Sequence, residues 1–353
     1  MSPAPAALRR ADLLDGFTIP TDLEATRPPE TRGIRRDRVR LMTTGPEGIG
    51  HHVFSDLPVL LTTGDLVVVN DSATLPAAVM VDRSLVIHFS TRLPGGLHVV
   101  EPRRPSGAAS LPYEGIGPGR LSLPGGAVLE LLAPYPHGAG EPHRLWVART
   151  ELPGPTTEYL TTWGRPIRYR HTDGPYKIEA YQTIFARKPG SAEMPSAGRP
   201  FTERLVTELT LSGVAIATLT LHTGVSSLEA GEDPYPEWFE IPEPTAALVN
   251  HTSSSGGRVI AVGTTVVRAL ETTADSRGVS HPGRSWTDLV IGPHHEPGVV
   301  DGLVTGWHEP ESTHLDLLEA FAGRSALANS YRAALECGYL WHEFGDSHLI
   351  LPG

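Results

Sequence analysis

Short apolar runs that end in glycine or in polar residues recur along the chain. The clearest is Val259 to Val262, which ends at Gly263. Four consecutive apolar residues between turn signals are typical of a strand buried on both faces. Thr264 or Thr265 can cap a helix that begins at Val266. This stretch therefore predicts a strand that turns through glycine into a helix N-terminus.

The same pattern predicts further α/β units. Leu66 to Val69 reads as a second buried strand, which ends at Asn70 and Asp71. Val214 to Leu221 reads as a third, which ends at His222. The acidic, proline-broken stretch 230–240 is expected to be a loop. Helices are expected at residues 204–212, 313–322 and 325–336, with N-caps at Thr202 and Ser312, and further strands at residues 288–291 and 302–304.

Residues 73–150 have a different pattern. Short apolar runs at residues 85–89, 97–100, 127–132 and 145–147 alternate with Pro-Gly-Gly turns, and helical periodicity is absent. Such spacing is typical of a small antiparallel barrel or sandwich. We therefore expect a multidomain α/β fold. An α/β body with a mixed sheet is built from residues 1–72 and 151–353, and residues 73–150 form an inserted small antiparallel β-barrel domain.

Composition narrows the function classes. Of the 353 residues, 39% are hydrophobic and 20% are charged, which fits a soluble globular protein. The net charge of −11 argues against a broadly basic surface, so a polyanion would need a local basic groove. Candidates for such a groove are Arg35, Arg36, Arg38 and Arg40, whose alternation resembles a strand edge, and a second set of Arg165, Arg168 and Arg170.

Cysteine and apolar content bear on the compartment. Cys337 is the only cysteine, so no intramolecular disulfide can form. The chain has no signal-peptide pattern and no apolar run near 18 residues. We therefore expect a cytoplasmic protein without membrane contact, and a monomer.

Two readings are open for the strongest motif. A helix N-terminus that follows a strand directs several backbone N–H groups at one point, where a carboxylate or a polyol can bind. An ordinary packing unit, with a surface ion pair between Arg268 and Glu271 one turn further on, is the simpler alternative. Asn70 and Asp71 have the same two readings, because both residue types also start turns.

Several motifs in order resemble one family, the S-adenosylmethionine:tRNA ribosyltransferase-isomerases that build the cyclopentene unit of queuosine. The resemblance covers nearly the whole chain, and its strength lies in the order of the pieces rather than in any single one. The matching pieces are Gly64–Asp71, Tyr181–Ala186, Ala197-Gly198 with Phe201-Thr202, Thr220–His222 with Gly224, Ala261–Thr265 with Arg268 and Leu270-Glu271, Val300-Asp301, Thr305, His308, Pro310, Ser312-Thr313, Ala320–Gly323 and Gly345-Asp346.

The chain departs from the family pattern at several points. Arg199-Pro200 stands where the pattern has Leu-His, and the His-x-Met-His-x-Glu box survives as Tyr235-Pro-Glu237. Thr-Asn-Phe-His-Leu-Pro becomes Thr305-Gly-Trp-His-Glu-Pro310. The segment after His222 and the proline-rich segment near residue 165 also differ. These departures concern the acceptor more than the cofactor half of the site.

The resemblance implies a reaction and a set of residues. The ribosyl group of S-adenosylmethionine is transferred to 7-aminomethyl-7-deazaguanine in tRNA and isomerised, and adenine and methionine leave. A positioned base removes a C5′ proton that the sulfonium acidifies. The implied proton-transfer residues are His222 and Asp346, followed by Glu237 and Glu271. The implied substrate-binding residues are Asn70, Asp71, Gly198, Gly263, Thr264, Thr265, Arg268, His308, Ser312 and Thr313.

Two other functions fit the same sequence. The chain could use S-adenosylmethionine as a ribosyl donor to a small-molecule acceptor, or bind S-adenosylmethionine without catalysis. A metal is not expected, since the sulfonium is itself the activated group. The 16 histidines and single cysteine also show no ligand spacing for a metal.

Overall fold

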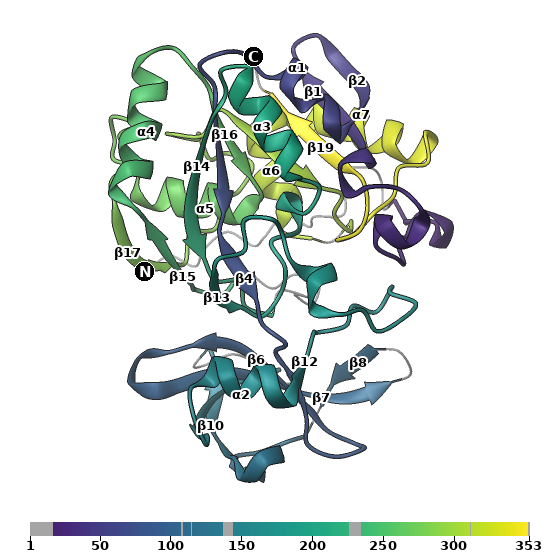
Figure 1. Cartoon of the computed structure of the whole chain (residues 1–353), viewed down its shortest axis with the longest axis vertical. Coiled ribbons are helices and arrows are strands. Elements are labelled where there is room, and N and C mark those ends of the chain that lie inside the picture. Colours follow the sequence, from purple (N-terminus) through teal and green to yellow (C-terminus); the bar gives the residue numbers. More distant parts are fainter. Residues whose placement is uncertain are drawn as a thin grey trace, which may run out of the picture.

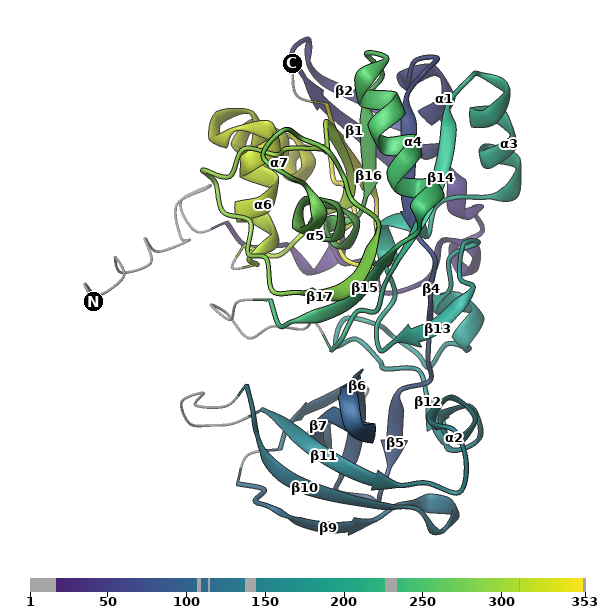
Figure 2. The ribbon, with the colours of Figure 1, turned by 90° about the vertical axis from the view of Figure 1, so that its left-hand side faces the viewer.

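A computed structural model describes residues 17–106, 109–113, 115–136, 144–225, 234–310 and 312–351. In this part of the chain the strands form two large sheets, and most helices surround the first (Figure 1). Figure 2 shows the second sheet as a separate layer beyond one end of the first. The predicted α/β class is therefore confirmed. None of the described helices is both long enough and apolar enough to cross a membrane.

The first sheet has nine strands and a parallel centre. Strands β14, β3, β16 and β18 run parallel to one another, so their carboxyl ends meet at one edge of the sheet. In sheet order the strands are β17 (Gly283–Thr287), β15 (Glu237–Ile241), β14 (Ala215–Leu221), β3 (Leu66–Asn70), β16 (Val259–Val262), β18 (Gly302–Gly306), β19 (Ser347–Ile350), β1 (Arg40–Gly45) and β2 (Gly48–Val53).

Helices cover both faces of this sheet because successive strand side chains point to opposite sides. Val67 and Val69 of β3 pack in the core under α1 (Leu57–Leu60) and α3 (Glu203–Leu211). Leu66 and Val68 pack in the core on the other face. That second core is covered by α4 (Glu243–Ser254), α5 (Thr264–Thr273), α6 (His314–Ala322) and α7 (Arg324–Glu336). The apolar runs at β3 and β16 are thus buried on both faces, as predicted.

The second sheet is antiparallel throughout. Its strands, in order, are β12 (Gly164–Arg165), β5 (Ala78–Met80), β6 (Val86–Arg92), β7 (Leu97–Ser106), β11 (Leu145–Glu151), β10 (Val128–Tyr135) and β9 (Gly119–Ser122), and β8 (Ala109–Pro112) pairs with β7. Helix α2 (Thr156–Trp163) packs against it. The sheet is curled (Figure 2). Among the described residues no hydrogen-bonded pairing joins its edge strands β9 and β12, so it is not a closed barrel.

Short elements complete the fold. Strand β4 (Ser72–Thr74) pairs in parallel with β13 (Lys188–Ser191). Single 3₁₀ turns occupy Thr21–Leu23, Pro29–Arg32, Arg36–Arg38, Phe54–Asp56, Pro94–Gly96, Pro124–Gly126, Ile178–Tyr181 and Ser196–Gly198.

Local signals predicted most elements and failed at a few. Thr202 caps α3, its hydroxyl accepting a hydrogen bond from the Leu205 N–H at 3.2 Å, as expected. The strand predicted at residues 288–291 is wrong, since β17 ends at Thr287. The loop predicted at 230–240 is wrong from Glu237, where β15 begins, and residues 226–233 lie outside the described part. The basic stretch at residues 36–38 is a 3₁₀ turn rather than a strand edge.

Candidate active site

A cavity of about 650 Å³ lies between the two sheets. It opens at the carboxyl ends of the parallel strands, where open α/β sheets place their ligands. Its volume is within the range of small-molecule sites. Its walls come from His88, Glu101 and Arg103 of the second sheet, and from residues 167–171, 193–197, 223–225, 234–237, 263–265, 305–309, 312–314 and 342–343.

The N-terminus of α5 opens into this cavity. Strand β16 ends at Gly263, whose φ of 91° suits glycine and turns the chain into the helix. Thr264 and Thr265 line the cavity beside it. Thr313 lines the same cavity, and its buried hydroxyl has no hydrogen-bond partner in the structure. The first turn of a helix has N–H groups without intrahelical partners, which suit an anionic or polyol group.

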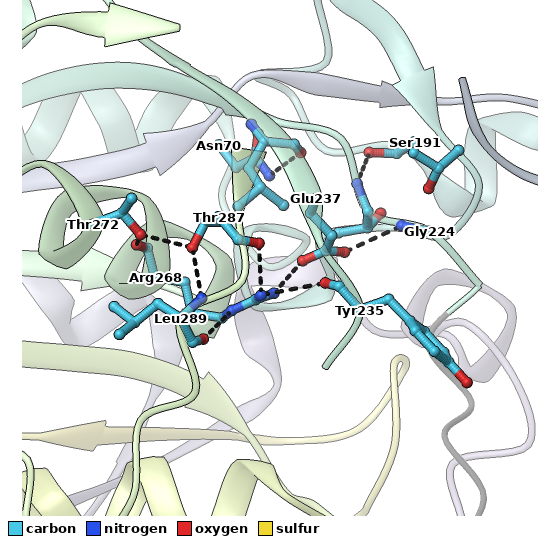
Figure 3. Close-up of polar contacts among 12 residues, drawn as sticks. Asn70, Ser191, Gly224, Tyr235, Glu237, Arg268, Thr272, Thr287 and Leu289 are labelled. Atoms are coloured by element: carbon cyan, nitrogen blue, oxygen red, sulfur yellow. Dashed lines mark hydrogen bonds and ion pairs between the residues drawn. The ribbon is translucent and has the colours of Figure 1, made fainter. Parts of the chain in front are cut away.

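Arg268 and Glu237 form a buried ion pair in the cavity wall (Figure 3). The other Glu237 oxygen accepts a hydrogen bond from the Gly224 N–H at 3.1 Å. Burial raises the pKa of Glu237, although Arg268 and the Gly224 N–H act in the opposite direction. A buried carboxylate with a raised pKa in a ligand cavity has the character of a general base.

The other donors of Arg268 are also engaged. Its Nε donates to the Leu289 carbonyl at 2.9 Å, and one terminal nitrogen donates to the carbonyls of Thr287 at 3.2 Å and Tyr235 at 3.3 Å (Figure 3). The guanidinium therefore holds Glu237 and three backbone carbonyls, from residues 235, 287 and 289, in place. Arg268 does not pair with Glu271, contrary to the simple helix-surface reading of the sequence.

Two neighbouring imidazoles stack in the cavity wall. The rings of His308 and His314 lie 4.5 Å apart between centroids, at 27°. His308 Nε2 is 2.9 Å from the Thr305 hydroxyl, and His314 Nδ1 is 2.9 Å from the Ser312 hydroxyl. Burial lowers the pKa of both histidines, that of His314 to about 4. Both rings are thus neutral at physiological pH and can orient hydroxyl groups of a ligand.

Trp307, also in the cavity wall, rests on a buried histidine. Its ring is stacked on His348 with centroids 4.7 Å apart. His348 is fully buried, and its Nε2 is 2.7 Å from the Thr44 hydroxyl. Burial lowers the pKa of His348 to about 3, so the ring is neutral in the folded protein.

His348 should make the protein less stable in acid. Its pKa is about 6.5 in the unfolded chain and about 3 in the folded one, so the unfolded state binds the extra proton between these values. The stability that depends on neutral His348 is complete above pH 6.5 and is lost as the pH falls toward 3. Denaturant unfolding of the wild type and His348→Gln between pH 8 and pH 4 measures this. The difference between them should shrink or change sign on acidification, and a constant difference would contradict the prediction.

Three predicted residues brace the carboxyl ends of the strands, and neither they nor Gly198 line the cavity. The Asn70 side chain bonds both backbone groups of Leu221, at 2.8 and 3.0 Å, and Asp71 accepts the Thr220 hydroxyl at 2.6 Å. His222 Nδ1 is 2.8 Å from the Ser72 hydroxyl, and its ring stacks on Trp238. Gly198 follows Ser196 and Ala197, which do line the cavity.

Glu271 and Asp346, predicted as proton-transfer residues, lie outside the cavity lining as well. Glu271 accepts hydrogen bonds from the N–H groups of residues 298, 299 and 300 at 2.8 to 3.1 Å. Asp346 accepts the backbone N–H groups of Arg40 and Leu340, both at 2.8 Å, and pairs with the Arg40 guanidinium. Each carboxylate holds backbone N–H groups in place.

Other cavity residues were missed by the sequence reading. They are Tyr169, His171, Glu193, His342 and Glu343, with His88, Glu101 and Arg103 from the second sheet. Residues 167–171 all line the cavity, and their run of consecutive polar residues was the signal that the sequence offered. Among the described residues no group of three or more histidine, cysteine, aspartate or glutamate side chains could hold a metal ion.

Fold and site define an α/β enzyme with its ligand cavity at the carboxyl ends of parallel strands. The chain belongs to the queuosine biosynthesis protein family, whose model matches residues 15–350. A relative from Gloeobacter violaceus, named S-adenosylmethionine:tRNA ribosyltransferase-isomerase, is 34% identical over 96% of this chain and 95% of its own. One of the same name from Moorella thermoacetica is 34% identical over 95% and 98%.

A solved structure gives the same result. The crystal structure of S-adenosylmethionine tRNA ribosyltransferase from Thermotoga maritima matches 95% of this chain and 99% of its own chain. The TM-score is 0.52 and the sequence identity is 28%. The resemblance found in the sequence motifs is therefore confirmed.

Proposed function

We propose that this protein is an S-adenosylmethionine-dependent ribosyltransferase-isomerase of queuosine biosynthesis. It transfers the ribosyl moiety of S-adenosylmethionine to 7-aminomethyl-7-deazaguanine in tRNA, giving epoxyqueuosine, adenine and methionine. The observation that carries this proposal is the family match over residues 15–350, supported by relatives of that name aligned over nearly their whole length. The names of the relatives favour tRNA over a small-molecule acceptor.

The direct test supplies both substrates. The protein is incubated with S-adenosylmethionine and tRNA that carries the deazaguanine, and adenine and the modified nucleoside are detected by mass spectrometry. Equimolar adenine and epoxyqueuosine are expected. Release of adenine without a modified nucleoside would instead point to a small-molecule acceptor, and no release would support a binding protein.

S-Adenosylmethionine binds, in this proposal, at the N-terminus of α5. The backbone N–H groups of the first turn and the Thr264, Thr265 and Thr313 hydroxyls would receive its carboxylate or ribose oxygens. His308 and Ser312 would complete that wall, and Arg268 would act through Glu237. Support comes from the unpaired Thr313 hydroxyl and from the cavity volume of about 650 Å³.

Binding should be visible as thermal stabilisation. At a concentration one hundred times Kd, a ligand that binds only the folded state adds about 2.7 kcal/mol to the free energy of unfolding. Thr313→Val keeps the side-chain shape and removes one hydrogen bond, so Kd should rise by about three- to tenfold. Differential scanning fluorimetry and calorimetric titration measure both effects. Lack of any shift at millimolar S-adenosylmethionine would contradict this site.

Glu237 is the proton acceptor in the proposed mechanism. The sulfonium acidifies the adjacent C5′ protons, and a carboxylate with a raised pKa can take one of them. Glu237 is favoured over His222, Glu271 and Asp346 because it alone of the four lines the cavity. The sulfonium already activates the sugar, so we propose that no metal takes part. The rate should then survive treatment with a chelator.

The tRNA would meet the basic residues at the cavity mouth. Arg168 and Arg170 line the cavity, whereas Arg36 is paired with Glu30 at 2.9 Å and Arg38 with the Ser55 hydroxyl at 3.2 Å. We expect tRNA affinity to fall by about 0.7–0.9 log units per phosphate contact per decade of salt.

The arginine set can be identified by this salt dependence. Arg168→Gln with Arg170→Gln should lower the slope by about one unit per contact, with S-adenosylmethionine affinity unchanged. Arg149→Gln, an exposed arginine of β11 paired with Glu130, is the matched control. If the slope falls in the double variant Arg36→Glu, Arg38→Glu and not in Arg168→Gln, Arg170→Gln, the tRNA groove lies at Arg36 and Arg38.

We also propose that residues 73–150 form an inserted β-barrel domain in an α/β body of residues 1–72 and 151–353. Strands β5 to β11 pair only with one another and with β12 among the described residues, and they share a core. Hydrogen exchange should then show a separate cooperative opening for this sheet. A monomer acting in the cytoplasm completes the proposal, and light scattering and cell fractionation test those two points.

A further inference from the structure

Four side chains that the proposed mechanism does not use form a compact cluster in the cavity wall. Tyr169 and His171 come from the extended segment after β12, and His342 and Glu343 come from the turn between α7 and β19. The ring centroids of Tyr169 and His171 are 5.7 Å apart, and those of His171 and His342 are 4.0 Å apart. The three rings are nearly parallel, at 6° and 11°.

The turn that carries two of these residues is strained. His342 has a φ of 71° and is the single non-glycine residue with positive φ in the described part of the chain. Such a conformation costs about 1–3 kcal/mol and persists where surrounding contacts enforce it. Here Asp346 holds the Leu340 N–H, and a side chain at Gly345 would lie 2.4 Å from the Leu340 carbonyl oxygen. These contacts hold the turn in one conformation and so fix the directions of the His342 and Glu343 side chains.

The cluster contains buried polar atoms without hydrogen bonds. These are His171 Nε2, His342 Nε2 and Glu343 Oε2. His171 Nε2 and Glu343 Oε2 form an ion pair at 2.9 Å, and His342 Nε2 lies 3.9 Å from Glu24 Oε1, but none of the three atoms has a well-directed hydrogen bond. The side chains of His171 and His342 are only 10% and 9% exposed. Buried polar atoms nearly always have a hydrogen bond, so three atoms beside a cavity that lack one indicate a polar ligand.

The protonation states of Glu343 and His342 determine which hydrogen-bonding groups the ligand needs. Burial raises the pKa of Glu343, but the contact with His171 outweighs it, and the net pKa is lowered. Glu343 is therefore an ionised carboxylate, which only accepts hydrogen bonds. Burial lowers the pKa of His342, so this ring is neutral. The ligand must bring N–H or O–H donors to Glu343.

The neighbouring residues fit a nucleotide of a polynucleotide chain. Arg168 and Arg170 line the cavity on the same segment as His171, and Arg168 Nε is buried without a hydrogen-bond partner. Arginines of this kind bind phosphates, and single-stranded RNA bases are read at their hydrogen-bonding edges. A guanine-type Watson–Crick edge has two adjacent donors, the ring N1–H and the 2-amino group, which match one carboxylate. An adenine edge presents an acceptor at ring N1.

We propose that this cluster receives the acceptor nucleobase, with the Glu343 carboxylate accepting hydrogen bonds from its guanine-type edge. The inference rests on the proposed function, because it assumes a deazaguanine in tRNA as the acceptor. His171 holds the carboxylate in place, His342 supports His171 by stacking, and the two arginines contact the flanking phosphates.

The test pairs a change in the protein with a change in the RNA. Two anticodon stem-loops are compared, one with 7-aminomethyl-7-deazaguanine and one with its analogue lacking the 2-amino group. Affinity is measured by fluorescence anisotropy for the wild type and Glu343→Gln. In the wild type, loss of the amino group should weaken binding by about ten- to a hundredfold, as for a hydrogen bond to a charged group. In Glu343→Gln the same loss should be less than about threefold.

Matched measurements keep the outcome clear. Glu179→Gln changes an exposed glutamate that does not line the cavity and should behave like the wild type. Glu343→Asp serves as the second variant where Glu343→Gln folds poorly. Equal losses in wild type and variant would overturn the proposal. Weaker S-adenosylmethionine binding by Glu343→Gln would also overturn it, because the carboxylate would then bind the ammonium group of S-adenosylmethionine. This experiment measures RNA binding and not turnover. A protein that binds the stem-loops as expected but forms no epoxyqueuosine would therefore contradict the proposed function and not this inference.

Discussion

Glu237→Gln should lower kcat by about 10²- to 10⁴-fold and leave the Kd for S-adenosylmethionine nearly unchanged. The amide keeps the size of the side chain, and its oxygen can still accept a hydrogen bond from Arg268 or Gly224. It cannot take a proton at neutral pH. Since proton removal from the carbon next to the sulfonium starts the proposed reaction, the loss should appear in turnover rather than in binding.

A residue on the same strand supplies the control. Glu240, three positions along β15, pairs with Lys188 at 2.7 Å and with Arg284 at 2.8 Å and does not line the cavity. Glu240→Gln should keep kcat within about twofold, as for surface substitutions away from a site. Adenine release under saturating substrates measures both variants. If Glu237→Gln keeps full turnover, another cavity group is the base, and His308 and Glu343 become the candidates.

The sequence predicted the fold best where a pattern depended on local contacts. Runs such as Val259 to Val262 are apolar because both faces of the strand are covered, and the residue types of the run alone reveal this requirement. β15 was missed because its short segment, Glu237 to Ile241, mixes polar and aromatic residues and follows prolines. Its pairing with β14 and β17 determines its conformation, and such long-range pairing leaves little trace in the local sequence.

The site was predicted in part for the same reason. Gly263, Thr264 and Thr265, which line the cavity, could be singled out because a strand, a glycine and a helix N-terminus lie together in the chain. His222 and Asp346 were chosen from motif position, but the structure directs them at Ser72 and Arg40. The sequence also paired Arg268 with Glu271 by helix spacing. The true partner, Glu237, is 31 residues away and could be identified only from the folded chain.

Arg268→Met should be the most destabilising single change in the site, lowering the free energy of unfolding by about 3–5 kcal/mol. The substitution removes the charge that compensates buried Glu237 and leaves three backbone carbonyls without their donor. Adding Glu237→Gln removes the uncompensated charge, so the double variant should be more stable than Arg268→Met alone. Denaturant unfolding measures all three proteins, and Arg204→Met, which changes an exposed helix-surface pair with Glu208, should have little effect.

The pH dependence of this loss identifies its cause. Burial raises the pKa of Glu237 even with Arg268 present, and removing the arginine raises it further. A carboxyl whose pKa is higher in the folded protein than in the unfolded chain destabilises the fold once the unfolded chain ionises, above pH 4.5. Below that pH both states are protonated, and the charge contribution vanishes. The gap between wild type and Arg268→Met should therefore be widest at pH 8 and narrow steadily toward pH 5. A gap that stays constant across this range would assign the loss to the three carbonyl hydrogen bonds alone.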